Sequence, residues 1–314
     1  MKRVLLIYAL LTLCFVKTTS AAEVKDTLKV GFYVFNIYDI DYKKGTYKLS
    51  LFAWALSNKK IYELDKYLDF SGQVGYNEYL NHEEVITDLN SDTLYWSEIE
   101  LQLEILQEFN ANKFPFDKEN IELAIEFTYE DSDSITFQVD NTSILDKIKI
   151  PNGWKFAAEP KIKTYITNYP TSFGDPRLDS YKVNTVGLTY VLARDSLALF
   201  LKMFVALFIS FLIACSSIFI SNDSFEPRFG LIVGGLFGTI SNKYITDSFL
   251  PESTSLNLSD KLHLLTITYL LIMTIVTIIE NRFKLDNNVK YEKYMFFGIL
   301  FSYIIFVALL IRYN

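Results

Sequence analysis

The long apolar stretches of this 314-residue chain are almost all confined to its last third. A helix needs roughly 17–25 mostly apolar residues to cross a bilayer. Once an N-terminal apolar segment is set aside, the stretches that meet this length all follow Asp195. These candidate spans are 197–220, 229–250, 262–279 and 295–311. The sequence therefore predicts a domain in water followed by a four-helix transmembrane bundle, which favours sensing, gating or transport over soluble enzyme classes.

Residues 1–22 are typical of a secretory signal peptide. A basic pair begins the chain, 4–16 form a short apolar core, and small residues offer a cleavage site. The alternative is a true first transmembrane helix, but this apolar core is too short to cross a bilayer. We therefore expect 23–195 to be an exported domain and 196–314 to be the membrane domain.

The charges in the loops predict the orientation of the membrane domain. Basic residues gather between the third and fourth candidate spans, at Arg282, Lys284, Lys290 and Lys293. The loop between the second and third spans has Lys261 together with acidic residues. Because cytoplasmic loops carry the excess of Lys and Arg, the exported domain and the C-terminus are expected on the opposite side. This agrees with the signal peptide and predicts a multi-pass protein with a periplasmic or extracellular N-terminal domain.

Alternating apolar and polar residues run through the exported segment. In 96–109, for example, Ile99, Leu101 and Leu103 alternate with charged or polar side chains. A period of two with one charged face indicates a half-buried strand. The predicted strands are 27–41, 47–56, 96–109, 121–127, 135–139, 161–169 and 181–192. Turn residues separate them without a helical period, so we expect an all-β sandwich.

Composition and motifs exclude several function classes. Cys14 and Cys215 lie in the signal peptide and the first candidate span, so the exported domain is not a disulfide scaffold. This domain is acidic within a chain of net charge −7, which does not favour nucleic acid. His82 and His263 are the two histidines, and no nucleophile elbow, cysteine–histidine pair or phosphate loop is present. We expect no catalytic residues, no cofactor and no metal, and interpret 82–84 as a solvated loop.

A Phe-Pro-Phe-Asp motif lies between two predicted strands. Its residues are Phe114, Pro115, Phe116 and Asp117. Arg194 lies just before the first span, Trp154 lies in an intervening loop, and prolines at 227 and 251 bound the second span. In this order the features resemble the pentameric ligand-gated ion channels of the Cys-loop receptor superfamily. The loop lacks flanking cysteines, as in the bacterial members.

The resemblance implies a homo-pentamer in the bacterial inner (cytoplasmic) membrane, in contact with membrane lipid. An unknown small ligand or a proton would bind to the exported domain and gate a pore for inorganic ions. The motif would couple the two domains, with Asp117 and Arg194 forming a partly buried ion pair near the membrane. The alternative is a turn that only packs the domain.

The resemblance also implies that the second span lines the pore. With successive residues about 100° apart, a narrow stripe of this helix unites Gly230, Gly234, Phe237, Ser241, Tyr244 and Ser248. Phe237 would be a hydrophobic gate that closes by dewetting. Glu226 would form a carboxylate ring at the cytoplasmic mouth and favour cations, although Arg228 opposes this. Off the stripe, Lys243 and Asp247 are four residues apart and could pair beside a neighbouring helix.

A second interpretation is open for the same helix. Gly230, Gly234 and Gly238 form a GxxxGxxxG pattern, which lets helices pack backbone to backbone. In addition, 197–220 lacks the proline that is usual in this span of the family. These departures favour a non-conducting envelope receptor or interaction protein with the same architecture.

Aromatic residues mark the candidate ligand site. By resemblance, it lies between subunits under the hairpin loop 168–180, near Tyr129, Tyr169, Phe173 and Tyr181. Aromatic faces suit cationic ammonium ligands. The alternative is that these residues are ordinary core or rim, because 16% of the chain is aromatic.

Overall fold

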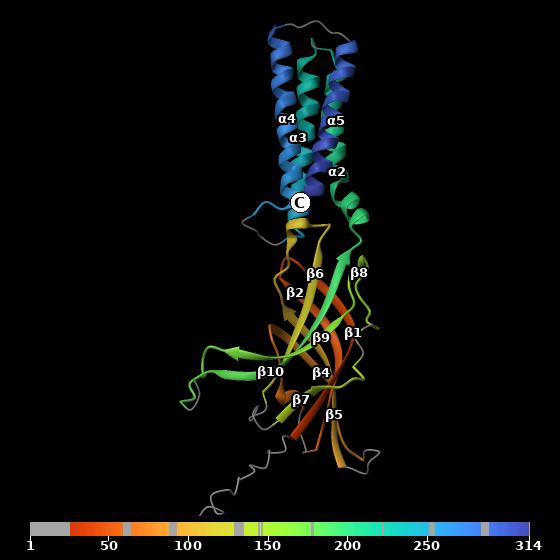
Figure 1. Ribbon diagram of the computed structural model, residues 1–314. Coiled ribbons are helices and arrows are strands. Elements are labelled where there is room, and N and C mark those ends of the chain that lie inside the picture. The colour runs from red at the N-terminus through yellow and green to blue at the C-terminus, as the bar shows by residue number, and fades with distance from the viewer. Residues whose placement is uncertain are drawn as a thin grey trace, which may run out of the picture.

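A computed structural model describes residues 26–58, 64–87, 93–128, 135–143, 145, 147–176, 179–221, 223–250, 255–283 and 289–313. The predicted signal peptide 1–22 and Tyr129 lie outside these residues. A β-rich domain comes first and a bundle of helices follows, and the two are stacked end to end (Figure 1). The last helix ends beside the β-rich domain, which places the C-terminal end of the chain at the junction (Figure 1).

Two five-stranded sheets form the β-rich domain. The first has the order β4 (Gln73–Thr87), β5 (Thr93–Leu106), β2 (Thr46–Ser57), β1 (Asp26–Asp41) and β7 (Ile135–Val139). The second contains β3 (Leu68–Phe70), β6 (Lys118–Phe127), β10 (Tyr181–Arg194) and β8 (Trp154–Phe156), with β9 (Lys161–Tyr169) paired to β10. Short 3-10 helices, η1 (Leu64–Tyr67) and η2 (Ala111–Lys113), connect strands.

One hydrophobic cluster contains side chains from both sheets. Phe32 and Leu51 enter it from the first sheet, and Ile125 and Tyr190 from the second; each is almost fully buried. In β5 the predicted alternation is confirmed, because Ile99, Leu101, Leu103 and Ile105 are all buried while their neighbours are more exposed. Burial of one face of β1, β2, β5, β6 and β10 therefore supplies the core that the absence of disulfides requires.

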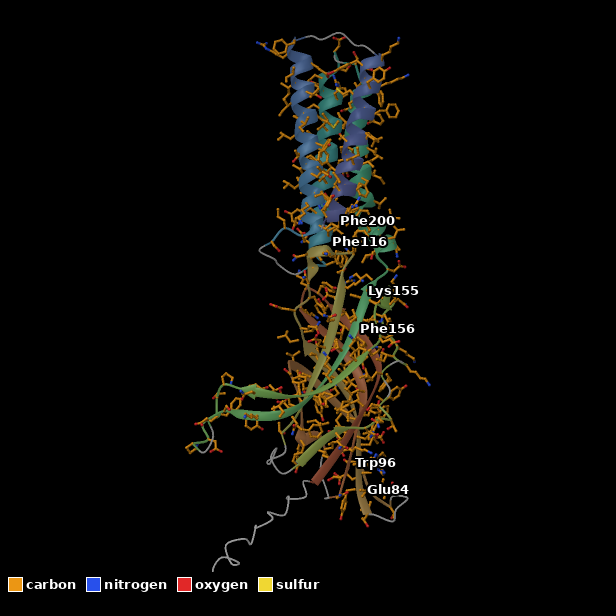
Figure 2. All side chains as sticks on the ribbon, in the orientation of Figure 1. Glu84, Trp96, Phe116, Lys155, Phe156 and Phe200 are labelled. Atoms are coloured by element: carbon orange, nitrogen blue, oxygen red, sulfur yellow. The ribbon has the colours of Figure 1, made fainter. Side chains whose placement is uncertain are left out.

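All the predicted strands are present, but the prediction missed β3, β4 and β8. The residues of β4 are exposed along nearly all of its length at the edge of its sheet, so its sequence has no apolar alternation to detect. The predicted loop 82–84 belongs to β4 instead. His82 packs edge-on against Trp96, with ring centroids 5.5 Å apart. Glu84 and Trp96 lie at the end of the domain farthest from the helices (Figure 2).

The helices are α2 (Ser196–Ser216), continued by η3 (Ser217–Phe219), α3 (Phe225–Asp247), α4 (Leu258–Phe283) and α5 (Val289–Tyr313). Among the described residues, three helical stretches are long and apolar enough to cross a membrane: 196–219, 258–283 and 290–313. The prediction of four such spans is wrong for 229–250, because glycines and charged residues lower the hydropathy of α3. Packing against α2 and α4 covers one side of α3.

The two faces of α3 differ in burial. The buried face consists of Arg228, Ile232, Gly235, Thr239, Asn242 and Thr246. At Gly235 the backbone approaches α2 so closely that an added Cβ would lie 2.7 Å from the carbonyl oxygen of Ser210. At Gly234 an added Cβ would have no neighbour within 4 Å, and the same is true of Gly230. Within the subunit, α3 therefore packs through Gly235 and Gly238 and not through the whole GxxxGxxxG pattern.

Adjacent glycines provide a matched test of this packing. Gly235→Ala should lower the free energy of unfolding by about 1–3 kcal/mol, because the added methyl group would lie too close to the backbone of α2. Gly234→Ala should be neutral or stabilise α3 by up to about 1 kcal/mol, since alanine is the better helix former. Thermal unfolding in detergent measures both. Equal losses in the two variants would contradict this orientation of α3.

Candidate functional site

The predicted Asp117–Arg194 ion pair is present at the junction between the two parts. Asp117 lies directly before β6, and Arg194 is the last residue of β10, two residues before α2 begins. Arg194 Nε donates to Asp117 Oδ2 at 3.0 Å, and both side chains are largely buried. The Tyr42 hydroxyl donates to the same carboxylate oxygen. This contact joins both sheets to the start of the first membrane helix.

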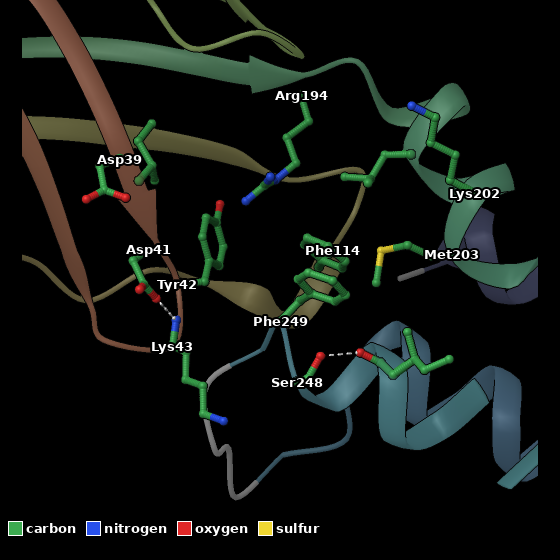
Figure 3. Close-up of a pocket in the computed structure, with 13 residues that line it drawn as sticks. Asp39, Asp41, Tyr42, Lys43, Phe114, Arg194, Lys202, Met203, Ser248 and Phe249 are labelled. Atoms are coloured by element: carbon green, nitrogen blue, oxygen red, sulfur yellow. Dashed lines mark hydrogen bonds between the residues drawn. The ribbon is translucent and has the colours of Figure 1, made fainter. Parts of the chain in front are cut away.

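Aromatic rings surround the Arg194 guanidinium. Its Cζ lies 4.1 Å from the ring centroid of Trp154, 4.3 Å from that of Tyr42 and 5.0 Å from that of Phe114. Cation–π attraction is strongest where the cation has lost water. Figure 3 shows the guanidinium pointing toward Tyr42, with Phe114 beside it. The three rings and the Asp117 carboxylate thus hold the Arg194 side chain in one orientation.

The Phe-Pro-Phe-Asp motif also makes the apolar contact between the two parts. Phe116 and Phe200 of α2 lie side by side with ring centroids 5.4 Å apart (Figure 2). Phe114, which precedes the cis bond to Pro115, is buried in a cluster with residues of α2 and α4 such as Met203 and Leu258. The structure therefore brings the predicted coupling residues together at one place.

A second buried carboxylate adjoins this pair. Glu119 is 4% exposed, and its Oε1 accepts no hydrogen bond from the described residues. Burial raises the pKa of Glu119, the Asp117 carboxylate adds to the rise, and Tyr42 and Arg194 oppose it. Burial and Asp117 also raise the pKa of Tyr42, which keeps its hydroxyl a donor. Sequence reasoning missed Glu119, although it shares the inward face of β6 with Ile121.

Replacing this carboxylate by its neutral isostere should change the pH dependence of stability. In the folded protein the pKa of Glu119 is raised above the ordinary value of 4.5. Protonation of Glu119 therefore stabilises the fold. This contribution is fully present below pH 4.5 and is lost as the pH rises through the folded-state pKa. Glu119→Gln should match wild type in melting temperature in acid and exceed it near neutral pH. The exposed Glu122→Gln serves as control and should follow wild type. A constant difference between Glu119→Gln and wild type at every pH would contradict the assignment.

A hollow of about 680 Å³ lies beside the junction (Figure 3). Tyr42, Phe114 and Arg194 form one side of it, and Met203 of α2 and Phe249 after α3 form another. The β1–β2 turn and the ends of two helices therefore face one space.

The predicted pore-lining stripe is exposed on the surface of the chain. Its members are Glu226, Gly230, Gly234, Phe237, Ser241, Tyr244 and Ser248, and each is exposed. Its large side chains are mostly accessible to solvent, Phe237 by 66% and Tyr244 by 76%. Arg228, by contrast, is 2% exposed and does not share this face.

Several polar residues of α3 outside the stripe are bonded to neighbouring helices. Lys243 pairs with Asp247 as predicted, and its Nζ lies 2.7 Å from Asp260 Oδ1 of α4. Asn242 Nδ2 donates to the Met203 carbonyl of α2 at 2.8 Å, and its Oδ1 lies 3.0 Å from His263 Nε2. These contacts fix the rotation of α3 about its axis, so that the stripe faces away from α2 and α4.

The β9–β10 hairpin unites three of the four candidate ligand-site residues. Ring centroids of Tyr169, Phe173 and Tyr181 lie 5.5–6.3 Å apart. The Tyr169 hydroxyl donates to both carboxylate oxygens of Glu126, at 2.7 and 2.8 Å, and this contact raises the pKa of Tyr169 to about 12. The hairpin projects sideways from the β-rich domain (Figure 1). The aromatic group is thus displayed away from the core.

Comparisons with protein-family models and with the curated proteins found no match. Within the part of the chain that the structure describes, no group of three His, Cys, Asp or Glu side chains is arranged to hold a metal ion.

Proposed function

We propose that this chain is a subunit of a homo-pentameric ligand-gated ion channel in which α3 lines the ion pathway. The observation that carries the proposal is the exposed stripe of α3, while Arg228, Asn242 and Lys243 off the stripe are bonded to α2 or α4. A helix with this many charged and polar residues is costly to place in lipid. A water-filled pathway shared with other copies would solvate the stripe without that cost.

The proposal also assigns the finer architecture. The two sheets form a β-sandwich around their common cluster, and α3 is a fourth span although its own hydropathy is low. Its neighbours α2 and α4 are apolar, and they shield its buried face from lipid. By this proposal the protein lies in the bacterial inner membrane, with the β-rich domain in the periplasm.

Coupling follows the contacts at the junction. A small ligand or a proton on the β-rich domain would shift the sheets, and the Asp117–Arg194 contact would transmit the shift to α2. The motif reaches α4 as well through Phe114. Coupling of this kind requires an element with two arrangements that the ligand stabilises to different degrees.

The aromatic hairpin supports a cationic amine as the ligand class. Tyr169, Phe173 and Tyr181 present ring faces, and the Glu126 carboxylate lies against the Tyr169 hydroxyl. Cations bind over aromatic faces, and a nearby negative charge strengthens this binding. Since the hairpin projects from its own subunit, the second wall of the site would come from a neighbouring copy.

A non-conducting envelope receptor with the same architecture is the second candidate. The bulky Phe237 and Tyr244 favour it, because five copies of each could close the lumen permanently. α2 also lacks an internal proline. Recordings from the purified oligomer separate the two candidates.

Phe237→Ala tests the proposed gate. Truncating an exposed ring should leave the subunit core intact and should open a leak, because a hydrophobic constriction conducts when it is widened and wetted. Planar-bilayer recordings of wild type and variant, over a screen of amines and pH, measure this. The control Ile232→Ala, on the buried face, should instead cost about 2–5 kcal/mol of stability without a leak. Silence of both wild type and Phe237→Ala in every condition would support the non-conducting receptor.

A further inference from the structure

A buried ion pair lies at the end of the bundle that is farthest from the β-rich domain. Arg228 Nη2 of α3 lies 2.8 Å from Glu280 Oε2 of α4, and the two side chains are 3% and 7% exposed. Arg228 Nε also donates to the Ser217 carbonyl of η3 at 3.2 Å. One arginine therefore connects the first turn of α3 with the ends of the two neighbouring helices.

The position of this pair bears on the charge of the exposed stripe. Glu226, at the start of the stripe, is exposed and lies two residues before Arg228. Residues two apart on a helix point to nearly opposite sides. An unpaired arginine at this point would reach water around the helix end and offset the Glu226 charge. The carboxylate of Glu280 neutralises Arg228 and retains it on the buried side.

A contribution to folding stability alone does not explain why this buried ion pair is present. Replacing a buried ion pair by apolar residues of similar volume is often neutral or stabilising, because both ions lose their hydration. Removing one partner is different, since it leaves the other charge buried and drives it toward water. Glu280 therefore acts on the location of a positive charge as well as on packing.

We infer that Glu280 masks the charge of Arg228, so that Arg228 does not offset the negative charge of Glu226 at this end of the α3 stripe. The consequence for ion preference rests on the proposed channel function, whereas the masking itself does not. In an oligomer with α3 around a lumen, the exposed carboxylate of each copy would form a negative ring, which favours cations. Glu280 is a positioning residue, because it acts through Arg228 without contacting the ions.

The masking can be measured without any current. Ser224→Cys places a thiol just before α3; with Cys14 replaced by serine and the native Cys215 fully buried, the background is low. In the full chain in vesicles, the ratio of labelling rates with cationic and anionic thiol reagents reports the local potential. Adding Glu280→Gln should lower this ratio several-fold, because the positive charge of Arg228 is then no longer neutralised by a carboxylate. Adding Arg228→Gln together with Glu280→Gln should restore it.

An unchanged ratio in Glu280→Gln, or a double variant that does not restore it, would overturn the masking. If Glu280→Gln is not recovered folded, Glu280→Asp retracts the carboxylate by one methylene and should lower the ratio in the same direction, and no change there would also overturn it. Reversal potentials in a KCl gradient then test the consequence. Glu280→Gln should shift them toward the anion value, with recovery in the double variant. A changed labelling ratio without current in wild type would refute the channel proposal and leave the masking intact.

Discussion

The bundle depends on one constraint: α3 carries charged and polar side chains that lipid cannot solvate. Three of them on the packed side have partners in another helix. Arg228 meets Glu280, Asn242 meets the Met203 carbonyl, and Lys243 meets Asp260. These contacts lie at different heights of the helix, so together they fix its rotation. The exposed stripe is what remains, and its orientation follows from the bonded side.

The same rotation connects the stripe with the junction. α2 begins two residues after Arg194, and Gly235 of α3 packs on the backbone of α2 with no room for a side chain. In the proposed channel, a movement at the Asp117–Arg194 contact would be carried into α2 and then into α3 by this close packing. Close-packed elements transmit such shifts because they cannot deform continuously.

Local periodicity made much of this predictable. The alternation in β5 identified a buried face, and the helical period placed Phe237 and Ser241 on one side of α3. Lys243 and Asp247 could be paired because they are four residues apart. The edge strand β4 was missed because its side chains are almost all exposed, so its sequence does not alternate between apolar and polar residues. The hydropathy of α3 was overestimated because the stretch was judged by its length, and the charge of Arg228 is compensated only by a tertiary contact.

Contacts between distant residues could not be predicted from local sequence patterns, and the Asp117–Arg194 pair, 77 positions apart, was predicted only through the family resemblance. Arg228 and Glu280 are 52 positions apart, and Tyr42 and Asp117 are 75 apart. Sequence reasoning treated Arg228 as an opponent of Glu226, because nothing local revealed the carboxylate that neutralises it. Glu119 was overlooked for the same reason: its burial depends on the junction and on residues of β1, β6 and β10 meeting there.

The most direct test of the pore-lining role of α3 is an averaged image of the purified oligomer, viewed along the membrane normal. The proposed function predicts a five-fold ring around a central lumen, with the Phe237 face of α3 directed inward. A monomer, or an oligomer in which this face packs against another helix without a lumen, would contradict it.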